Sequence, residues 1–122
     1  MTHDRIHWMQ TLFLPADRSP RVDSWAPLVD VYRTRDGWLI KCDLAGVAAE
    51  DLTLTIAGPC LTVRGSRRDW CLEEGCSHYL LEISYSQFER TIELPENVEP
   101  ATVTTEFREG MLLVRIQREA SR

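Results

Sequence analysis

A chain of 122 residues, with 43% hydrophobic and 27% charged side chains, has the size and composition of one globular domain. Its net charge of -5 and the lack of a Lys/Arg cluster argue against a nucleic-acid partner. No apolar run approaches the roughly 20 residues of a membrane span. No long apolar segment follows the N-terminus either, so we expect no membrane partner, no secretory signal and a cytoplasmic location.

The first segment, residues 1–25, differs in composition from the rest of the chain. Its apolar side chains gather in one stretch and are Trp8, Met9, Leu12, Phe13 and Leu14. Four-residue spacings within this set predict a short amphipathic helical turn, which Pro15 ends. Because so short a helix is marginal alone, we expect an apolar arm that is partly helical or disordered and needs a partner for its apolar face.

Short runs of alternating apolar and polar residues follow from Pro27 onward. They predict strands, in chain order, over residues 29–31, 38–44, 52–56, 61–65, 79–84, 92–94, 102–107 and 112–116. Residues 33–37 and 58–59 supply turns, and residues 48–51 predict one helical turn or a loop. Several short strands without a long helical pattern indicate an all-β domain of the sandwich type.

The last two predicted strands carry the clearest pattern in the chain. Val103, Thr105 and Phe107 alternate with polar residues, and the alternation resumes at Leu112 beyond a short turn that contains Gly110. Two such runs around a Gly-containing turn predict a β-hairpin. No acid, base or nucleophile in it is placed for chemistry, so the segment is expected to pair strands and present apolar surface.

The segment 66–78 is too long for a tight hairpin and holds Trp70, Cys71 and Leu72 at its middle. A tryptophan is unusual on an isolated surface loop. Either Trp70 folds back onto its own sheet, or the loop reaches a second subunit and adds a short strand to its sheet edge.

The four cysteines favour unpaired thiols over a metal site or a disulfide. Cys42 lies in an alternating run and is expected to be a small buried hydrophobe, whereas Cys60 is ambiguous. Cys71 and Cys76 bracket four residues, which is not the paired spacing of a zinc site with four ligands. We therefore expect no metal and no cofactor.

Several motifs together resemble the small heat shock proteins, whose shared module is the alpha-crystallin domain. The likeness covers about residues 26–117 and lies in the order and spacing of its pieces. These are Pro27-Leu-Val-Asp-Val-Tyr, Ile40-Lys-Cys-Asp-Leu-Ala-Gly-Val, Leu61-Thr-Val-Arg-Gly65, Phe88-x-Arg90-x-x-x-Leu94-Pro95 and Phe107-Arg-Glu-Gly-Met-Leu. Departures from the family pattern are Ala45 for its usual Pro, Ser86 for its usual Gly and Thr105 for its usual Ala.

The resemblance implies an immunoglobulin-like β-sandwich that acts as an ATP-independent holdase on unfolded or misfolded clients. It implies a homodimer in which a strand from the long loop is exchanged, here Asp69, Trp70, Cys71 and Leu72. The partner's receiving edge is represented by Leu28, Asp30 and Tyr32. It also implies an apolar groove between two edge strands, for which the candidates are Leu54, Ile56, Val103 and Thr105. These four side chains have an alternative role as plain core.

Residues 118–122 contain no Ile-X-Ile motif, the tail that family members dock into a neighbour's groove. We therefore expect a dimer, a small dynamic oligomer or a hetero-oligomer with a longer relative. A co-chaperone or scaffold module of the CS-domain type is the alternative, and the long 66–78 loop argues against it. A thiol enzyme using Cys71 or Cys76 is a further alternative, but no catalytic motif supports it, so we expect no enzyme.

Overall fold

The structure, a computed structural model, describes residues 7–9, 25–69 and 73–119. Its regular structure is strand apart from one short 3-10 turn, η1 (Ala49–Asp51). The strands are β1 (His7–Met9), β2 (Val29–Arg33), β3 (Gly37–Asp43), β4 (Leu52–Ala57), β5 (Cys60–Arg67), β6 (Ser86–Glu93), β7 (Ala101–Arg108) and β8 (Met111–Arg118). The all-β class expected from the short alternating runs is confirmed.

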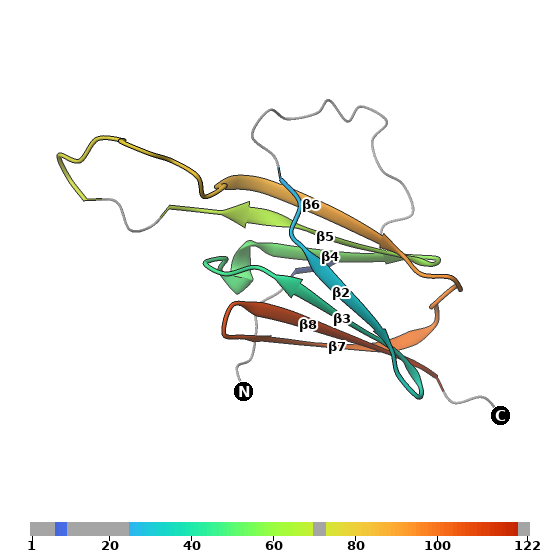
Figure 1. Ribbon diagram of the computed structural model, residues 1–122. Helices are drawn as coiled ribbons and strands as arrows, with labels where there is room; N and C mark the ends of the chain where they lie inside the picture. The colour runs from blue at the N-terminus through green and yellow to red at the C-terminus, as the bar shows by residue number, and fades with distance from the viewer. Residues whose placement is uncertain (1–6, 10–24, 70–72, 120–122) are drawn as a thin grey trace.

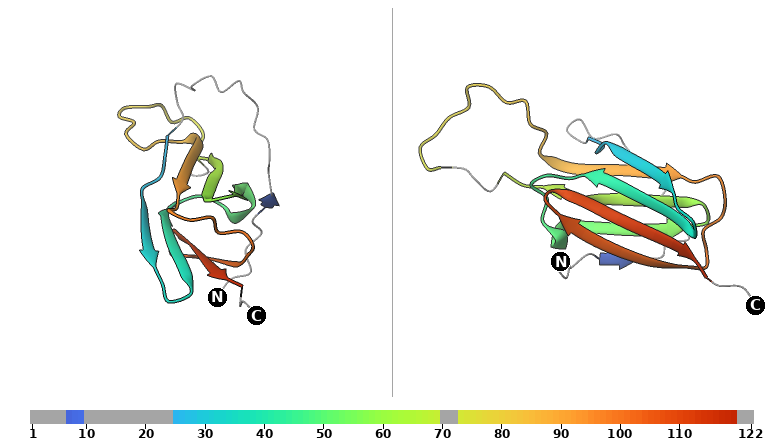
Figure 2. Two further views of the ribbon diagram at one scale, coloured as in Figure 1. Left: turned by 90° about the vertical axis from the view of Figure 1, so that its right-hand side faces the viewer. Right: turned by 60° about the horizontal axis from the view of Figure 1, so that its bottom comes forward.

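The strands form two four-stranded sheets that lie as two layers (Figure 1, Figure 2). One sheet has the order β1-β4-β5-β6 and the other the order β2-β3-β8-β7. Every pairing is antiparallel except that of β1, which runs parallel to β4. Two mainly antiparallel sheets packed face to face give the expected immunoglobulin-like sandwich.

The predicted C-terminal hairpin is present with a tight two-residue turn. β7 pairs with β8 from Ala101 opposite Arg118 to Arg108 opposite Met111. The turn residues Glu109 and Gly110 have φ angles of 54° and 80°. Positive φ at both positions is the requirement of the hairpin turns whose twist matches that of the strands. The Gly110 carbonyl oxygen also accepts a hydrogen bond from the Leu44 N–H at 2.8 Å, which ties the turn to the end of β3.

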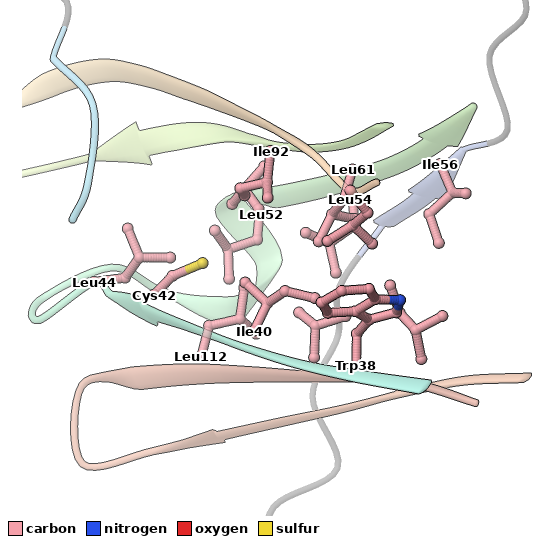
Figure 3. Close-up of a cluster of buried hydrophobic side chains, with 14 of the residues drawn as sticks. Trp38, Ile40, Cys42, Leu44, Leu52, Leu54, Ile56, Leu61, Ile92 and Leu112 are labelled. Carbon is pink, nitrogen blue, oxygen red and sulfur yellow. The ribbon is translucent and has the colours of Figure 1, made fainter. Parts of the chain in front are cut away.

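The core lies between the two sheets and is built from alternate positions of the central strands (Figure 3). The buried apolar side chains of β3, β4, β5 and β8 are Trp38, Ile40, Cys42, Leu52, Leu54, Ile56, Leu61, Val63, Leu112, Val114 and Ile116. Since successive residues of a strand face opposite sides, this set follows directly from the period-two pattern of the sequence. The prediction that Cys42 is a small buried hydrophobe is confirmed.

Burial makes the Cys42 thiol less acidic than an exposed thiol, and this has a measurable consequence. It raises the pKa of this thiol from 9.0 to about 12, an effect that the positive charge of Arg90 partly opposes. In the unfolded chain the thiol ionises first, so the free energy of unfolding should fall as pH rises from 9.0 to about 12. Below that window both states hold the proton, and the stabilising contribution is complete. The expected slope is about 1.4 kcal/mol per pH unit.

Urea unfolding of the wild-type chain and of Cys42→Val, at several pH values across this window, measures the effect. Cys42→Val keeps an apolar side chain of similar size but has no proton to lose. Its free energy of unfolding should therefore fall less steeply with pH than that of the wild type. Identical slopes would show that the buried thiol does not titrate as described.

β5 continues two residues beyond the end expected from the sequence. Gly65 was expected to stop the strand, but β5 runs on to Arg67. A Cβ atom at Gly65 would meet the Asp51 carbonyl oxygen and, at 2.8 Å, the Phe88 ring. Glycine is therefore placed here because η1 and Phe88 approach the strand closely, which is a recognised reason for glycine inside a strand.

The helical turn expected in the arm is wrong for residues 7–9. These residues form β1, with His7, Trp8 and Met9 opposite Thr53, Leu54 and Thr55. The physical reason is that a short isolated helix is marginal, whereas the edge of β4 offers backbone groups ready to pair. The other candidate arm residues, Leu12, Phe13 and Leu14, lie outside the described residues.

Candidate binding surfaces

β2 forms an edge of its sheet and exposes apolar side chains there. It pairs with β3 on one side, and Leu28, Val31 and Tyr32 are 75%, 40% and 44% exposed. Val31 pairs with Ile40, so both side chains lie on the same face of the sheet. Because Ile40 is buried and Val31 is 40% exposed, the facing sheet does not fully cover β2. Asp30 is also exposed. An edge with open backbone groups and apolar side chains is suited to receive another strand.

The start of β2 is fixed to the opposite sheet by a residue of the family-like motif. Arg90 of β6 donates a hydrogen bond from Nη1 to the Pro27 carbonyl oxygen at 2.9 Å. The Asp43 N–H donates to the Leu28 carbonyl oxygen at 3.0 Å from the other side. These two hydrogen bonds fix the backbone at the start of β2. Among the described residues, no strand pairs with the outer edge of β2.

The loop between β5 and β6 carries the largest exposed apolar surface among the described residues. Tyr79, Leu80, Leu81 and Ile83 are 100%, 69%, 66% and 64% exposed. The strand predicted over residues 79–84 is wrong for this single chain, because the segment extends away from the body without a neighbouring strand to pair with (Figure 1). An alternating apolar segment that is left exposed points to a partner outside the chain.

Of the four residues expected to form the exchanged strand, the structure describes one. Asp69 is described and exposed, whereas Trp70, Cys71 and Leu72 lie outside the described residues. The period-two pattern of residues 79–83 predicted a strand but not that these residues would be exposed. What the pattern does not show is that, among the described residues, this segment pairs with no strand of its own chain.

The base of this loop is held by one side chain, Arg67. Its Nε and Nη2 both donate to the Ser84 carbonyl oxygen at 2.9 and 2.6 Å, and its Nη1 donates to the Ala45 carbonyl oxygen at 3.0 Å. Its guanidinium lies 4.2 Å from the centre of the Trp25 ring and 5.8 Å from that of Tyr85. Four chain segments therefore meet at this cation.

The four expected groove residues fall into two groups. Leu54 and Ile56 are 0% and 8% exposed and belong to the core, so their side chains offer little accessible surface. Val103 and Thr105 on β7 are partly buried, and Val103 packs against the core from the sheet edge. The outer edge of β4 is itself paired with β1. That these residues line a client or tail groove stays a prediction.

A buried carboxylate on β7 was not foreseen. Glu106 is 4% exposed although it occupies the face of β7 that was expected to be polar and solvated. Its oxygens lie 3.1 Å from Arg108 Nε and 3.2 Å from Arg115 Nη1, and these two side chains cover it. The sequence signal was the spacing of Arg108, two residues along the same strand face.

The thiols and acidic groups of the described residues form no metal centre. Cys42, Cys60 and Cys76 are free, and Cys76 is exposed on the loop. Within the described ranges, no group of three or more His, Cys, Asp or Glu residues is placed to hold a metal ion. Within the same ranges, no helix has the length and apolar character needed to cross a bilayer.

Comparison with known proteins adds a family to this geometry. The model of the Hsp20/alpha crystallin family matches residues 30–122. The Spore protein SP21 of Stigmatella aurantiaca is 30% identical over 95 residues, and small heat shock protein C2 of Rickettsia felis is 26% identical over 93 residues. These matches cover 78% and 76% of this chain but only 56% and 60% of the relatives, so the chain spans less than two thirds of their length.

A solved structure supports assignment to the same family. The hspA from Xanthomonas axonopodis aligns with a TM-score of 0.64 at 26% sequence identity, covering 77% of this chain and 94% of that one. The solved HSP18.5 from E. histolytica shares the fold with a TM-score of 0.64 at 21% identity. The sandwich, the order of its motifs and the extent of the family match show that this chain belongs to the Hsp20/alpha crystallin family.

Proposed function

We propose that this chain is an ATP-independent chaperone of the holdase type, acting in the cytoplasm on unfolding proteins. Family membership supports a chaperone role. The observation that carries the proposal is the edge of β4 beside the apolar arm: among the described residues it is covered by the three-residue strand β1 alone, which a client segment can replace. Unfolding proteins expose similar apolar segments and strand edges, which otherwise pair with one another and aggregate. Covering them requires binding alone, without a cofactor or a chemical step.

The exposed apolar side chains of β2 and of the β5–β6 loop support a homodimer. The family resemblance assigns the exchanged strand to Asp69–Leu72, of which residues 70–72 lie outside the described residues. Segment 79–83 of the same loop is a second candidate to add as a strand to the β2 edge of a second copy, beside Leu28, Asp30 and Tyr32. Tyr79, Leu81 and Ile83 stand at alternate positions of this segment and are exposed. Leu28 and Tyr32 of the receiving edge are exposed as well. Strand addition satisfies backbone groups on both sides, and the paired side chains leave water together. A small dynamic oligomer or a hetero-oligomer with a longer relative is compatible with this contact.

Clients are proposed to bind through the arm and the adjoining sheet edge. The candidate arm residues are Trp8, Met9, Leu12, Phe13 and Leu14. β1 pairs with β4 over three residues, and each hydrogen bond contributes only about 0.5–1.5 kcal/mol net. An extended client segment is therefore able to replace β1 on β4. Val103 and Thr105 of β7 remain the further candidates for the groove.

The test is suppression of heat-induced aggregation of a client enzyme, measured by light scattering at equimolar chaperone with and without ATP. The full chain should suppress scattering equally well in both conditions. Deleting residues 1–24 should abolish suppression, while circular dichroism shows an intact sandwich. Full suppression by the truncated chain would remove the arm from the mechanism, and no suppression by the full chain would reject the holdase function.

A further inference from the structure

We propose that Arg67 is the positioning residue of the dimerisation surface and that it couples the orientation of the β5–β6 loop to Trp25. This inference rests on the proposed strand exchange through residues 79–83. Arg67 ends β5, where the ladder with β6 closes opposite Ser86. The loop that carries the exposed apolar residues leaves and returns at this point (Figure 1). Whatever fixes the two stems here sets the direction in which the loop extends.

The hydrogen bonds of Arg67 restrain the returning stem beyond the last ladder pair. Two of its donors converge on the Ser84 carbonyl oxygen, and a third reaches the Ala45 carbonyl oxygen in the loop after β3. Hydrogen bonds from a charged donor are stronger than neutral ones. Ser84 is thereby tied both to its own sheet and to a segment that follows the opposite sheet.

The backbone next to these bonds needs such support. Ser86 has a φ angle of 86°, in the left-handed region that favours glycine. A side-chain-bearing residue held there costs about 1–3 kcal/mol and persists only where its surroundings determine the conformation. The two bonds to Ser84 lie two residues before this turn. Arg67 thus helps to hold the strained corner at which the loop rejoins β6.

The aromatic contacts of Arg67 connect this corner to Trp25. The Trp25 ring lies under the guanidinium and 5.0 Å from the Phe88 ring, centre to centre. Its backbone lies along β6, donating to the Gln87 carbonyl oxygen at 3.2 Å and accepting from the Glu89 N–H at 3.1 Å. Among the described residues its buried Nε1 has no hydrogen-bond partner. The position of the indole therefore depends on its ring contacts, of which Arg67 is one.

One cation consequently serves both the loop and the residue that follows the arm. If Trp25 moves, Arg67 loses its stacking partner, and the restraint on Ser84 weakens.

The test uses the full chain with Arg67→Lys and Arg68→Lys as matched variants. Lysine keeps the charge but has neither the planar fork nor the stacking surface of arginine. Arg68 is the adjacent arginine, and its described contact is one ion pair with Asp51 at 2.7 Å, so Arg68→Lys controls for a general effect. The measurements are the dimer dissociation constant by sedimentation, hydrogen–deuterium exchange of residues 79–85, and Tm.

Arg67→Lys should raise the dimer dissociation constant by about tenfold and accelerate exchange in the loop, whereas Arg68→Lys should leave both unchanged. Both variants should melt close to the wild type. A wild-type dissociation constant and wild-type loop exchange in Arg67→Lys would overturn the inference. If the wild-type chain forms no dimer, the proposed strand exchange fails. In that case faster hydrogen–deuterium exchange of the loop in Arg67→Lys would still establish positioning by Arg67. Unchanged hydrogen–deuterium exchange would reject it.

The link to Trp25 is tested by a double-mutant cycle with Trp25→Leu. If the two side chains act through one contact, the fold-change of the double variant should be smaller than the product of the two single fold-changes. Loop exchange rates provide the same comparison independently of dimer formation. Multiplicative effects in both measurements would show that Arg67 and Trp25 act separately and would overturn the coupling.

Discussion

Replacing Leu81 and Ile83 together by aspartate is expected to give a folded monomer. Both side chains are more than 60% exposed in the single chain and are proposed to become buried against β2 of a second copy. Burying two such side chains contributes about 3–6 kcal/mol, so the dissociation constant should rise by at least about a hundredfold. Sedimentation velocity measures the loss of dimer, and circular dichroism checks that the sandwich is intact.

Leu80→Asp supplies the matched control. Leu80 has nearly the same exposure as Leu81, but it stands at the alternate position of the segment. In an added strand, neighbouring residues face opposite sides, so Leu80→Asp should weaken the dimer much less than the double variant. Equal weakening by both would show that the segment does not bind as a strand. An unaffected dimer in the double variant would place the interface elsewhere.

Phe88→Ala is expected to have the largest effect on stability of any single substitution considered. The Phe88 side chain is 1% exposed, contacts the Trp25 ring and fills the space beside Gly65. Truncation of a buried phenylalanine costs about 3–5 kcal/mol, a large part of the stability of a domain. Urea unfolding should show a lower midpoint with little change in slope.

Phe107→Ala is the comparison for this substitution. Phe107 packs against the same core from β7 but is only partly buried. Since less apolar surface is returned to water and the site opens to solvent, its loss of stability should be clearly smaller. Equal losses would mean that Phe88 has no special place at the junction of β5, β6 and Trp25.

Much of the fold follows from short-range pattern, and the hairpin of β7 and β8 shows why. Its two alternating runs and its Gly110 turn specify register and turn geometry within a few residues of each other. The buried set of β3 follows in the same way from the alternation that begins at Trp38. Sequence periodicity predicts such elements because their partners are adjacent or their faces are one-sided.

The remaining features depend on contacts between distant parts of the chain. The alternation over residues 79–83 predicted a strand, but a strand also requires a pairing partner, and among the described residues of this chain the segment has none. Gly65 was expected to end a strand, because the approach of Asp51 and Phe88 is invisible in local sequence. The burial of Glu106 depends on arginines from two strands, and the meeting of Arg67 with Ala45 and Trp25 joins segments far apart in the chain.

The open rim of β2 and the projecting loop have a consequence for how the protein limits its own growth. A molecule that carries both a strand to donate and an edge that receives one can add further copies head to tail and form an open-ended filament. Reciprocal exchange between two copies uses both features at once and closes the assembly. Because a fixed corner allows one direction of departure, rigidity at the loop's root would favour closed pairs over endless chains.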